Sequence, residues 1–182
     1  MSRKIIVLNG SPRPKGNTAA LIEAFTKGAE EAGHTVTAFF LDKMNIGGCK
    51  GCYGGGKDPE SPCVQKDGMD TIYPVLREAD IVVLASPLYY WTISGQLKTA
   101  IDRIFAVAES YPEYHIPAKD CVLLMAAESD EYEEALHYYR GLMKHLGWNS
   151  AGEVLAQGVV SVGDITGKPV LEDARKLGAS IR

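Results

Sequence analysis

The sequence lacks the features that would place it in several large functional classes. No stretch of the 182 residues approaches the roughly eighteen apolar residues of a membrane-spanning helix, and the start lacks the apolar core of a signal peptide. The net charge of −4 gives no basic face for nucleic acid or an anionic membrane. We therefore expect a cytoplasmic protein without nucleic-acid or membrane partners, whose four cysteines stay reduced.

Three phosphate-binding motifs are also missing. A Walker loop has four residues between its glycines and then Lys-Ser/Thr, whereas here five residues separate Gly10 from Gly16 and Asn17-Thr18 follow. The dinucleotide fingerprint fails because Ser11 and Pro12 stand where a close approach to pyrophosphate requires glycine. No cysteine lies near Arg13, which excludes a cysteine-based phosphatase loop.

A strand, a loop and a helix are nevertheless predicted over residues 4–33. Ile5–Leu8 is a short β-branched run, and glycines and prolines interrupt residues 10–16. Apolar residues then recur at helical spacing up to Gly33, with Asn17 and Thr18 available as side-chain caps. The helix therefore begins at the carboxyl end of a buried strand, where its free N–H groups and partial positive charge suit a phosphate.

The loop side chains favour a terminal monophosphate. Hydroxyl and amide groups can donate to phosphate oxygens, and two cations can offset a charge of about −1.5 to −2. These candidate residues are Ser11, Arg13, Lys15, Gly16, Asn17 and Thr18.

The remaining chain alternates strands and helices without a repeat or a linker. We expect one α/β domain over residues 1–182, a doubly wound five-stranded parallel sheet with helices on both faces and the flavodoxin-like strand order 2-1-3-4-5. The expected strands are 5–8, 35–41, 81–85, 121–125 and 153–160, and the expected helices are 17–32, 69–78, 95–108, 132–146 and 169–177.

Two further loops are expected beside the first one. In the predicted order the first and third strands flank the topological switch point, so the segment Pro87–Trp91 joins the phosphate loop at one crevice. Its backbone groups and aromatic rings suit a flavin ring, although the same aromatics also suit a subunit interface, and both roles can coexist. Ala127, after the fourth strand, is small enough to let the backbone approach that ring.

The segments GSPRPKGNT and SPLYYWTISGQLKTAIDR together resemble the NADPH-dependent FMN reductase family of flavodoxin-like proteins, including its iron–sulfur flavoprotein branch. The resemblance extends from Lys4 to about Asp173. It implies that the first loop holds the FMN phosphate and that Pro87–Trp91 lines the isoalloxazine. The cofactor-binding set predicted in this way is Ser11, Arg13, Lys15, Gly16, Asn17, Thr18, Pro87, Leu88, Tyr89, Tyr90, Trp91 and Ala127.

This resemblance predicts an FMN-dependent oxidoreductase that passes electrons from NADPH or NADH, through bound FMN, to a small acceptor. Quinones, nitroaromatics, metal ions and free flavins are all candidate acceptors, and a homodimer or homotetramer is expected. The chemistry takes place at flavin N5, so no catalytic side chain is required. The alternatives are a flavodoxin-type electron carrier and an iron–sulfur flavoprotein that relays electrons between FMN and a cluster.

The cysteines bear on that last alternative. Cys49 and Cys52 form a C-x2-C pair followed by Cys63, but the iron–sulfur branch adds another cysteine soon after the pair, where this chain has glycines at 54–56. A cubane cluster requires four thiolates, and Cys121 begins a predicted core strand. We therefore expect no cluster. For the metal candidates Cys49, Cys52 and Cys63, a zinc site, a redox-active pair and no role at all remain open.

The histidines and a strand-end acid complete the candidates. His34, His115, His137 and His145 show no metal-ligand spacing and are expected on the surface or on a helix face. Asp42 lies where a dinucleotide-binding domain places its ribose-binding acid, but without the glycine fingerprint a solvated aspartate is expected.

Overall fold

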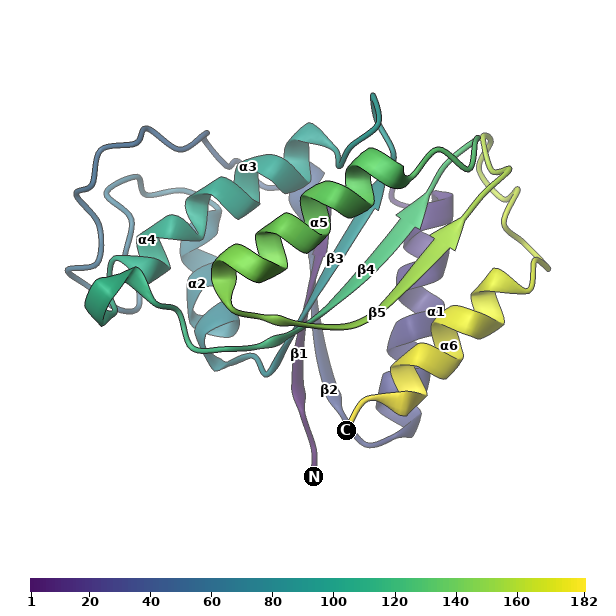
Figure 1. The fold of residues 1–182 in the computed structure, drawn as a ribbon, viewed down its shortest axis with the longest axis horizontal. Coiled ribbons are helices and arrows are strands. Elements are labelled where there is room, and N and C mark those ends of the chain that lie inside the picture. The colour runs from purple at the N-terminus through teal and green to yellow at the C-terminus, as the bar shows by residue number, and fades with distance from the viewer.

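The computed structural model, which describes residues 1–182, is a parallel sheet of order β2-β1-β3-β4-β5 covered by helices on both faces (Figure 1). The predicted α/β class, strand order and parallel pairing are confirmed. The strands are β1 Lys4–Asn9, β2 Thr35–Phe40, β3 Ile81–Pro87, β4 Asp120–Ala126 and β5 Asn149–Ala156. The helices are α1 Asn17–Glu31, α2 Met69–Glu78, α3 Gly95–Arg103, α4 Phe105–Ala108, α5 Glu133–Leu146 and α6 Val170–Ser180, with 3-10 turns at Leu41–Lys43 and Pro112–Tyr114.

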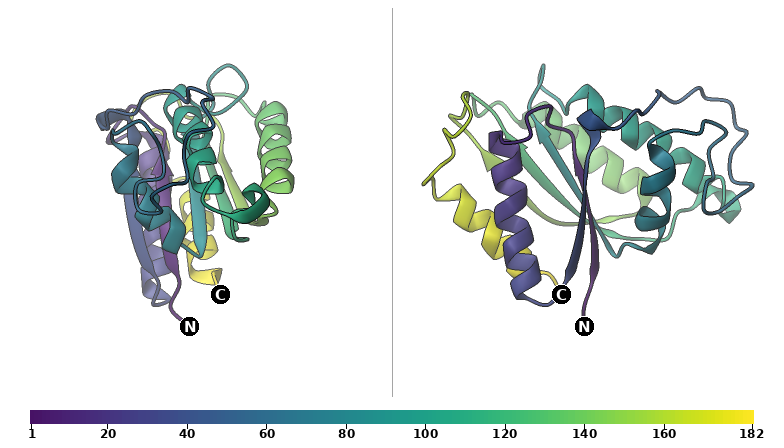
Figure 2. Two further views of the ribbon diagram at one scale, coloured as in Figure 1. Left: turned by 90° about the vertical axis from the view of Figure 1, so that its left-hand side faces the viewer. Right: turned by 180° about the vertical axis from the view of Figure 1, so that it is seen from behind.

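The core forms two layers, one on each face of the sheet. Residues of α2, α3, α4 and α5 pack on one face, and residues of α1 and α6 pack on the other (Figure 2). The central strands β1, β3 and β4 are buried along nearly their whole length. Their continuous apolar runs are explained by this double coverage, because neither face of these strands meets water.

Most predicted helix ends agree with the structure. The Ser94 hydroxyl accepts the Leu97 N–H at the start of α3, and Gly147 ends α5 in the left-handed conformation. The start of α1 differs from the prediction. Its N-cap is Gly16, and no side chain caps the helix, so Asn17 and Thr18 do not act as caps.

Three other expectations were wrong. Strand β5 covers Asn149–Ala156 rather than 153–160, because polar residues at 149–153 lie at a sheet edge where exposure is tolerated. The predicted helix 95–108 is divided at Ile104 into α3 and α4. His34 is buried rather than exposed, and its ring contacts the Arg3 N–H and the Ile181 carbonyl.

Two glycines let α1 and α6 approach each other closely. A Cβ built on Gly28 would lie 1.9 Å from the Arg175 carbonyl oxygen, and one on Gly178 would lie 2.1 Å from the Phe25 carbonyl oxygen. The two backbones therefore touch, and larger side chains at these positions would force the helices apart.

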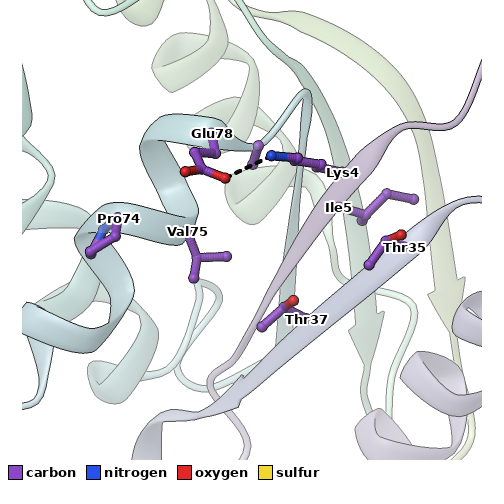
Figure 3. A pocket seen from close by; sticks show the side chains of 8 residues that line it. Lys4, Ile5, Thr35, Thr37, Pro74, Val75 and Glu78 are labelled. Atoms are coloured by element: carbon purple, nitrogen blue, oxygen red, sulfur yellow. Dashed lines mark hydrogen bonds and ion pairs between the residues drawn. The ribbon is translucent and has the colours of Figure 1, made fainter.

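The amino edge of the sheet carries a cavity of about 300 Å³ that lies away from the loops of interest. It is lined by the starts of β1 and β2 and by the last turns of α2, and the Lys4 ammonium binds the Glu78 carboxylate at 2.7 Å across it (Figure 3). None of the helices combines the length and the apolar character needed to cross a membrane.

Candidate functional site

The three predicted loops follow β1, β3 and β4 and meet at the carboxyl edge of the sheet. Because β1 and β3 are neighbours and their chains leave in opposite directions along the sheet, this edge holds the topological switch point (Figure 1). The Gly10 N–H donates to the Ala85 carbonyl at 2.8 Å, and the Ser94 hydroxyl donates to the Gly10 carbonyl at 2.7 Å. The first loop is thereby fixed to the segment that follows β3.

The first loop, residues 10–16, is a series of tight turns. The Ser11 N–H donates to the Asn9 side-chain oxygen at 2.9 Å, and the Ser11 hydroxyl accepts the Arg13 N–H at 3.2 Å. Ser11, Asn17 and Thr18 are buried, whereas the side chains of Arg13 and Lys15 are exposed. The backbone N–H groups of residues 17–19 make no hydrogen bond within the chain. The helix start thus keeps its donors available for an anion.

A fourth loop, residues 157–166 after β5, closes over the first one and was missed in the sequence analysis. Arg13 donates from its guanidinium to the Val160 carbonyl at 2.8 Å. The Asn17 amide donates to the Ser161 carbonyl at 3.0 Å and accepts the Ile165 N–H at 3.3 Å. Two predicted phosphate ligands therefore also join α1 to this fourth loop.

Asp164 fixes the shape of the fourth loop. Its carboxylate accepts the N–H groups of Val160 and Ser161 at 2.8 and 2.7 Å, and these two bonds hold the pKa of Asp164 below its usual range. One sequence signal could have indicated this arrangement. Asp164 follows Val160 by four residues and Ser161 by three, a spacing at which an aspartate side chain commonly accepts backbone N–H groups in a turn.

The second and third loops line a single cavity of about 430 Å³. Four of its residues come from the segment after β3, and the other four come from the segment after β4. They are Leu88, Tyr89, Tyr90, Trp91, Ala127, Glu128, Ser129 and Glu131. The structure therefore brings together the predicted ring-binding residues, apart from Pro87, which ends β3 at the base of the loop.

The loop after β3 presents its aromatic rings to solvent from a strained backbone. Tyr90 and Trp91 have φ angles of 47° and 61°, a region that bulky residues rarely adopt, and Tyr89 pairs with Thr92 through two backbone hydrogen bonds. Tyr90 is 92% exposed and Trp91 is 54% exposed. Backbone strain of this kind gathers at ligand-binding sites, where the surrounding structure fixes it.

The Arg103 guanidinium clamps the cysteine-containing segment, residues 44–67, to α3. It binds the Asp67 carboxylate at 2.6 and 3.2 Å and donates to the Gly47 carbonyl at 2.7 Å. The Arg103 side chain is 1% exposed and that of Asp67 is 10% exposed. Burial alone would raise the pKa of Asp67, but bonds from Arg103 and from the N–H groups of Gly47 and Met69 outweigh it, so this pKa lies below its usual range.

Three of the four cysteines lie around one small space in that segment. Cys49, Cys52 and Cys63 share it with Arg103 and Glu109, yet no three metal-ligating side chains of the chain are gathered as a metal site would gather them. Cys121 is fully buried, and burial raises the pKa of its thiol to about 12. Its predicted place in the core is confirmed.

Gly55 and Gly56, two of the three glycines at 54–56, leave little room for a side chain. A Cβ on Gly55 would lie 2.3 Å from a carboxylate oxygen of Glu109, which accepts the Gly55 N–H at 3.2 Å. A Cβ on Gly56 would lie 2.3 Å from the Glu109 carbonyl oxygen. The backbone is packed against the end of α4, so the residues present do not fit a cluster held by four thiolates.

Comparison with known proteins decides the family. Residues 3–163 match the family described as NADPH-dependent FMN reductase. The chain belongs to this family. Its members are flavin-dependent oxidoreductases whose cofactor is FMN and whose electron donor is NAD(P)H. The family, the enzyme class and the cofactors expected from the sequence are therefore confirmed.

Individual relatives agree with this assignment. An iron–sulfur flavoprotein of Archaeoglobus fulgidus is 31% identical over 98% of this chain and 78% of its own. An iron–sulfur flavoprotein of Methanocaldococcus jannaschii is 39% identical over 55% of this chain, which spans about half of that relative's length. An NAD(P)H:quinone oxidoreductase from Methanothermobacter marburgensis, 23% identical, superposes with a TM-score of 0.74 over 98% of this chain and 96% of its own and shares the fold.

The site described above fits FMN. The free N–H groups at the start of α1 and the buried hydroxyl of Ser11 suit its phosphate, and the cavity between the second and third loops suits its ring. When bound, FMN supplies the capacity to accept a hydride and to return two electrons.

Proposed function

We propose that residues 1–182 form one FMN-binding domain in which the loop 11–18 holds the phosphate and the segments 87–91 and 127–131 hold the isoalloxazine. The observation that carries this proposal is the convergence of both segments on one cavity beside a helix start with unbonded N–H groups. NAD(P)H and then a small acceptor reach the same open side in turn, and this sharing predicts ping-pong kinetics.

The test is a steady-state assay of the FMN-loaded protein with NADPH or NADH and a series of quinone, nitroaromatic, metal and flavin acceptors. Parallel lines in double-reciprocal plots are expected for each acceptor that supports turnover. Absence of turnover with every acceptor, in protein that contains stoichiometric FMN, would contradict the proposal and favour an electron carrier. Such a carrier would instead stabilise a one-electron reduced flavin during titration.

Arg13→Ala tests the cationic side of the phosphate site. The guanidinium is exposed and also donates to the Val160 carbonyl, so we expect FMN affinity to fall by about tenfold, the equivalent of one charge-assisted hydrogen bond, while the fold persists. Flavin fluorescence titration measures the affinity, and Arg140→Ala on the exposed face of α5 is the matched control. Unchanged affinity in Arg13→Ala would mean that amides and hydroxyls hold the phosphate without this cation.

Iron analysis tests the relay alternative. After anaerobic reconstitution we expect less than stoichiometric iron and acid-labile sulfide, because three thiols are neighbours and the fourth, that of Cys121, is buried in the core. Gly55→Cys should not restore binding, since its Cβ would collide with Glu109. A stoichiometric cubane cluster in the unaltered protein would overturn this prediction and support the relay.

We also propose that the protein acts in the cytoplasm as a homodimer or homotetramer. Exposed aromatic side chains, including Tyr90, Trp91 and Tyr114, support an interface between copies. The free cysteines support a reducing compartment. Sedimentation equilibrium of the FMN-loaded protein measures its mass, and a monomer at micromolar concentration would contradict the oligomer.

A further inference from the structure

The mouth of the ring cavity carries negative charge only. Among its lining residues are the carboxylates of Glu128 and Glu131, and no lysine, arginine or histidine lines it. Asp130 lies between them in the sequence, and Glu133 and Glu134 begin α5 directly after them, all three exposed. The nearest cations in the three loops, Arg13 and Lys15, belong to the phosphate loop after β1 and not to this cavity.

The backbone that carries these carboxylates is fixed. The Ala127 N–H donates to the Ala156 carbonyl at 2.9 Å, and the Gly158 N–H donates to the Glu128 carbonyl at 3.0 Å. Buried Tyr132 donates from its hydroxyl to the Ala156 carbonyl at 2.6 Å and anchors the other end of the loop. Glu128 and Glu131 therefore project from a rigid segment and impose their charge on whatever enters the cavity.

The rest of the lining is apolar and aromatic. Leu88, Tyr89, Tyr90 and Trp91 form the facing wall, against which we propose that the isoalloxazine lies, so an acceptor ring or a nicotinamide ring enters on the side of the flavin that this wall leaves open. An anionic substituent on such a ring would be brought close to two carboxylates with no cation to offset it. The two carboxylates do not repel a neutral ring, and they attract a cationic one.

We propose that the electron acceptor is an uncharged or cationic aromatic or quinonoid compound and that Glu128 and Glu131 exclude acceptors whose ring carries an anionic group. This inference rests on the proposed function and names the substrate class of the same site. For a quinone, NAD(P)H supplies a hydride, water supplies one proton, and the acceptor gains two electrons and two protons to become a hydroquinone while NAD(P)⁺ is released.

The same charge agrees with the chemistry of the donor. Loss of a hydride converts the uncharged dihydronicotinamide ring into a pyridinium cation. Two carboxylates at the mouth of the cavity attract that positive ring and would repel a negative one. The same preference therefore applies to the nicotinamide ring of the donor and to the ring of the acceptor.

The size of the effect follows from Coulomb's law. Two unit charges roughly 6 Å from a ring substituent, in surroundings close to water, together correspond to about a tenfold discrimination against a single negative charge. Removal of one carboxylate should therefore reduce the discrimination by about threefold. Because the carboxylates are exposed, high salt should weaken the effect further.

The experiment compares a 1,4-naphthoquinone with its ring-sulfonated form in FMN-loaded protein, as a ratio of kcat/KM values. The difference in reduction potential between the two quinones is the same for every variant, so it cancels when variants are compared. Glu128→Gln and Glu131→Gln should each shift the ratio about threefold towards the sulfonate, and the double variant about tenfold. Glu133→Gln, which removes an exposed charge outside the cavity, is the matched control and should leave the ratio unchanged.

A binding measurement without turnover completes the test. The dissociation constants of 2-naphthol and 2-naphthalenesulfonate, measured by NMR titration of the FMN-loaded protein, should show the same discrimination and the same loss in the two glutamine variants. If neutral quinones are reduced but neither ratio responds to Glu128→Gln or Glu131→Gln, the inference is wrong while the proposed function stands. If no quinone is reduced and neither naphthalene compound binds, both are wrong.

Discussion

Replacing Arg103 by methionine lowers the free energy of unfolding by about 3–5 kcal/mol. The guanidinium is 1% exposed, and its loss leaves the carboxylate of Asp67 without its partner in a site that is nearly closed to water. The carbonyl of Gly47 loses a donor at the same time. Methionine keeps the apolar volume of the side chain, so the expected change reports the charge and the hydrogen bonds rather than a cavity. Urea denaturation followed by tryptophan fluorescence measures it.

Two further variants make this test specific. Combining Arg103→Met with Asp67→Asn removes the stranded charge and should recover part of the lost stability, whereas two independent sites would give additive losses. Arg175→Met removes an exposed arginine that pairs with Glu31 and Glu172, and should change stability little. If Arg103→Met were as mild as Arg175→Met, the buried pair would not hold the segment 44–67 in place.

The same pair predicts how stability depends on pH. The pKa of Asp67 is lower in the folded protein than the value of about 3.9 for an unfolded chain. The contribution of Asp67 to the free energy of unfolding is therefore complete above the pKa of the unfolded chain, and it is lost as the pH falls through the lower pKa of the folded protein. Between neutral pH and about pH 3, the stability of the unaltered protein should fall more steeply than that of Asp67→Asn. Equal slopes would mean that other carboxylates dominate acid unfolding.

Asn17→Asp should weaken FMN binding by about 20-fold, the second large effect that we expect. The substitution keeps the size of the side chain but places a negative charge at the first residue of α1, beside the N–H groups that suit the phosphate. A unit charge about 4 Å from a phosphate of charge −1.5 to −2 is repelled by about 1.5–2 kcal/mol in surroundings close to water. Fluorescence titration of the apoprotein with FMN measures the loss.

Riboflavin provides the control within the same variant. It carries the same ring without the phosphate, so its affinity should be the same in Asn17→Asp as in the unaltered protein. Asn17 also donates to the Ser161 carbonyl, and a parallel loss of riboflavin affinity would therefore mean that the fourth loop had moved and that the charge itself was not responsible. A loss confined to FMN places the phosphate at the start of α1.

The pattern of the sequence was sufficient for the architecture. Continuous apolar runs in the central strands and helical periodicity between them predict a doubly wound sheet, because only parallel strands covered on both faces need no polar side. Local signals marked Ser94 as a cap and Gly147 as a helix end for reasons that lie within one turn of backbone. The loops after β1, β3 and β4 were brought to one edge by the strand order alone.

Contacts between distant segments account for what the sequence did not reveal. The position of β5 was shifted by four residues because an edge strand tolerates polar side chains, and His34 is buried by its contact with the other end of the chain. The Arg103 clamp joins α3 to a segment 36 residues earlier, and Arg13 meets the Val160 carbonyl 147 residues later. No periodicity or local motif encodes such pairs.

The sequence by itself determined the order of strands and helices, the loop before α1 and the family, since each depends on neighbouring residues or on a contiguous motif. Only the tertiary structure decided which groups at the site are free and which are engaged. Asn17 binds the fourth loop rather than its own helix, and the first N–H groups of the helix, which follow the N-cap Gly16, are unbonded. The physical reason is that a polar side chain takes the partner that folding brings within reach, and that partner lies 144 residues away.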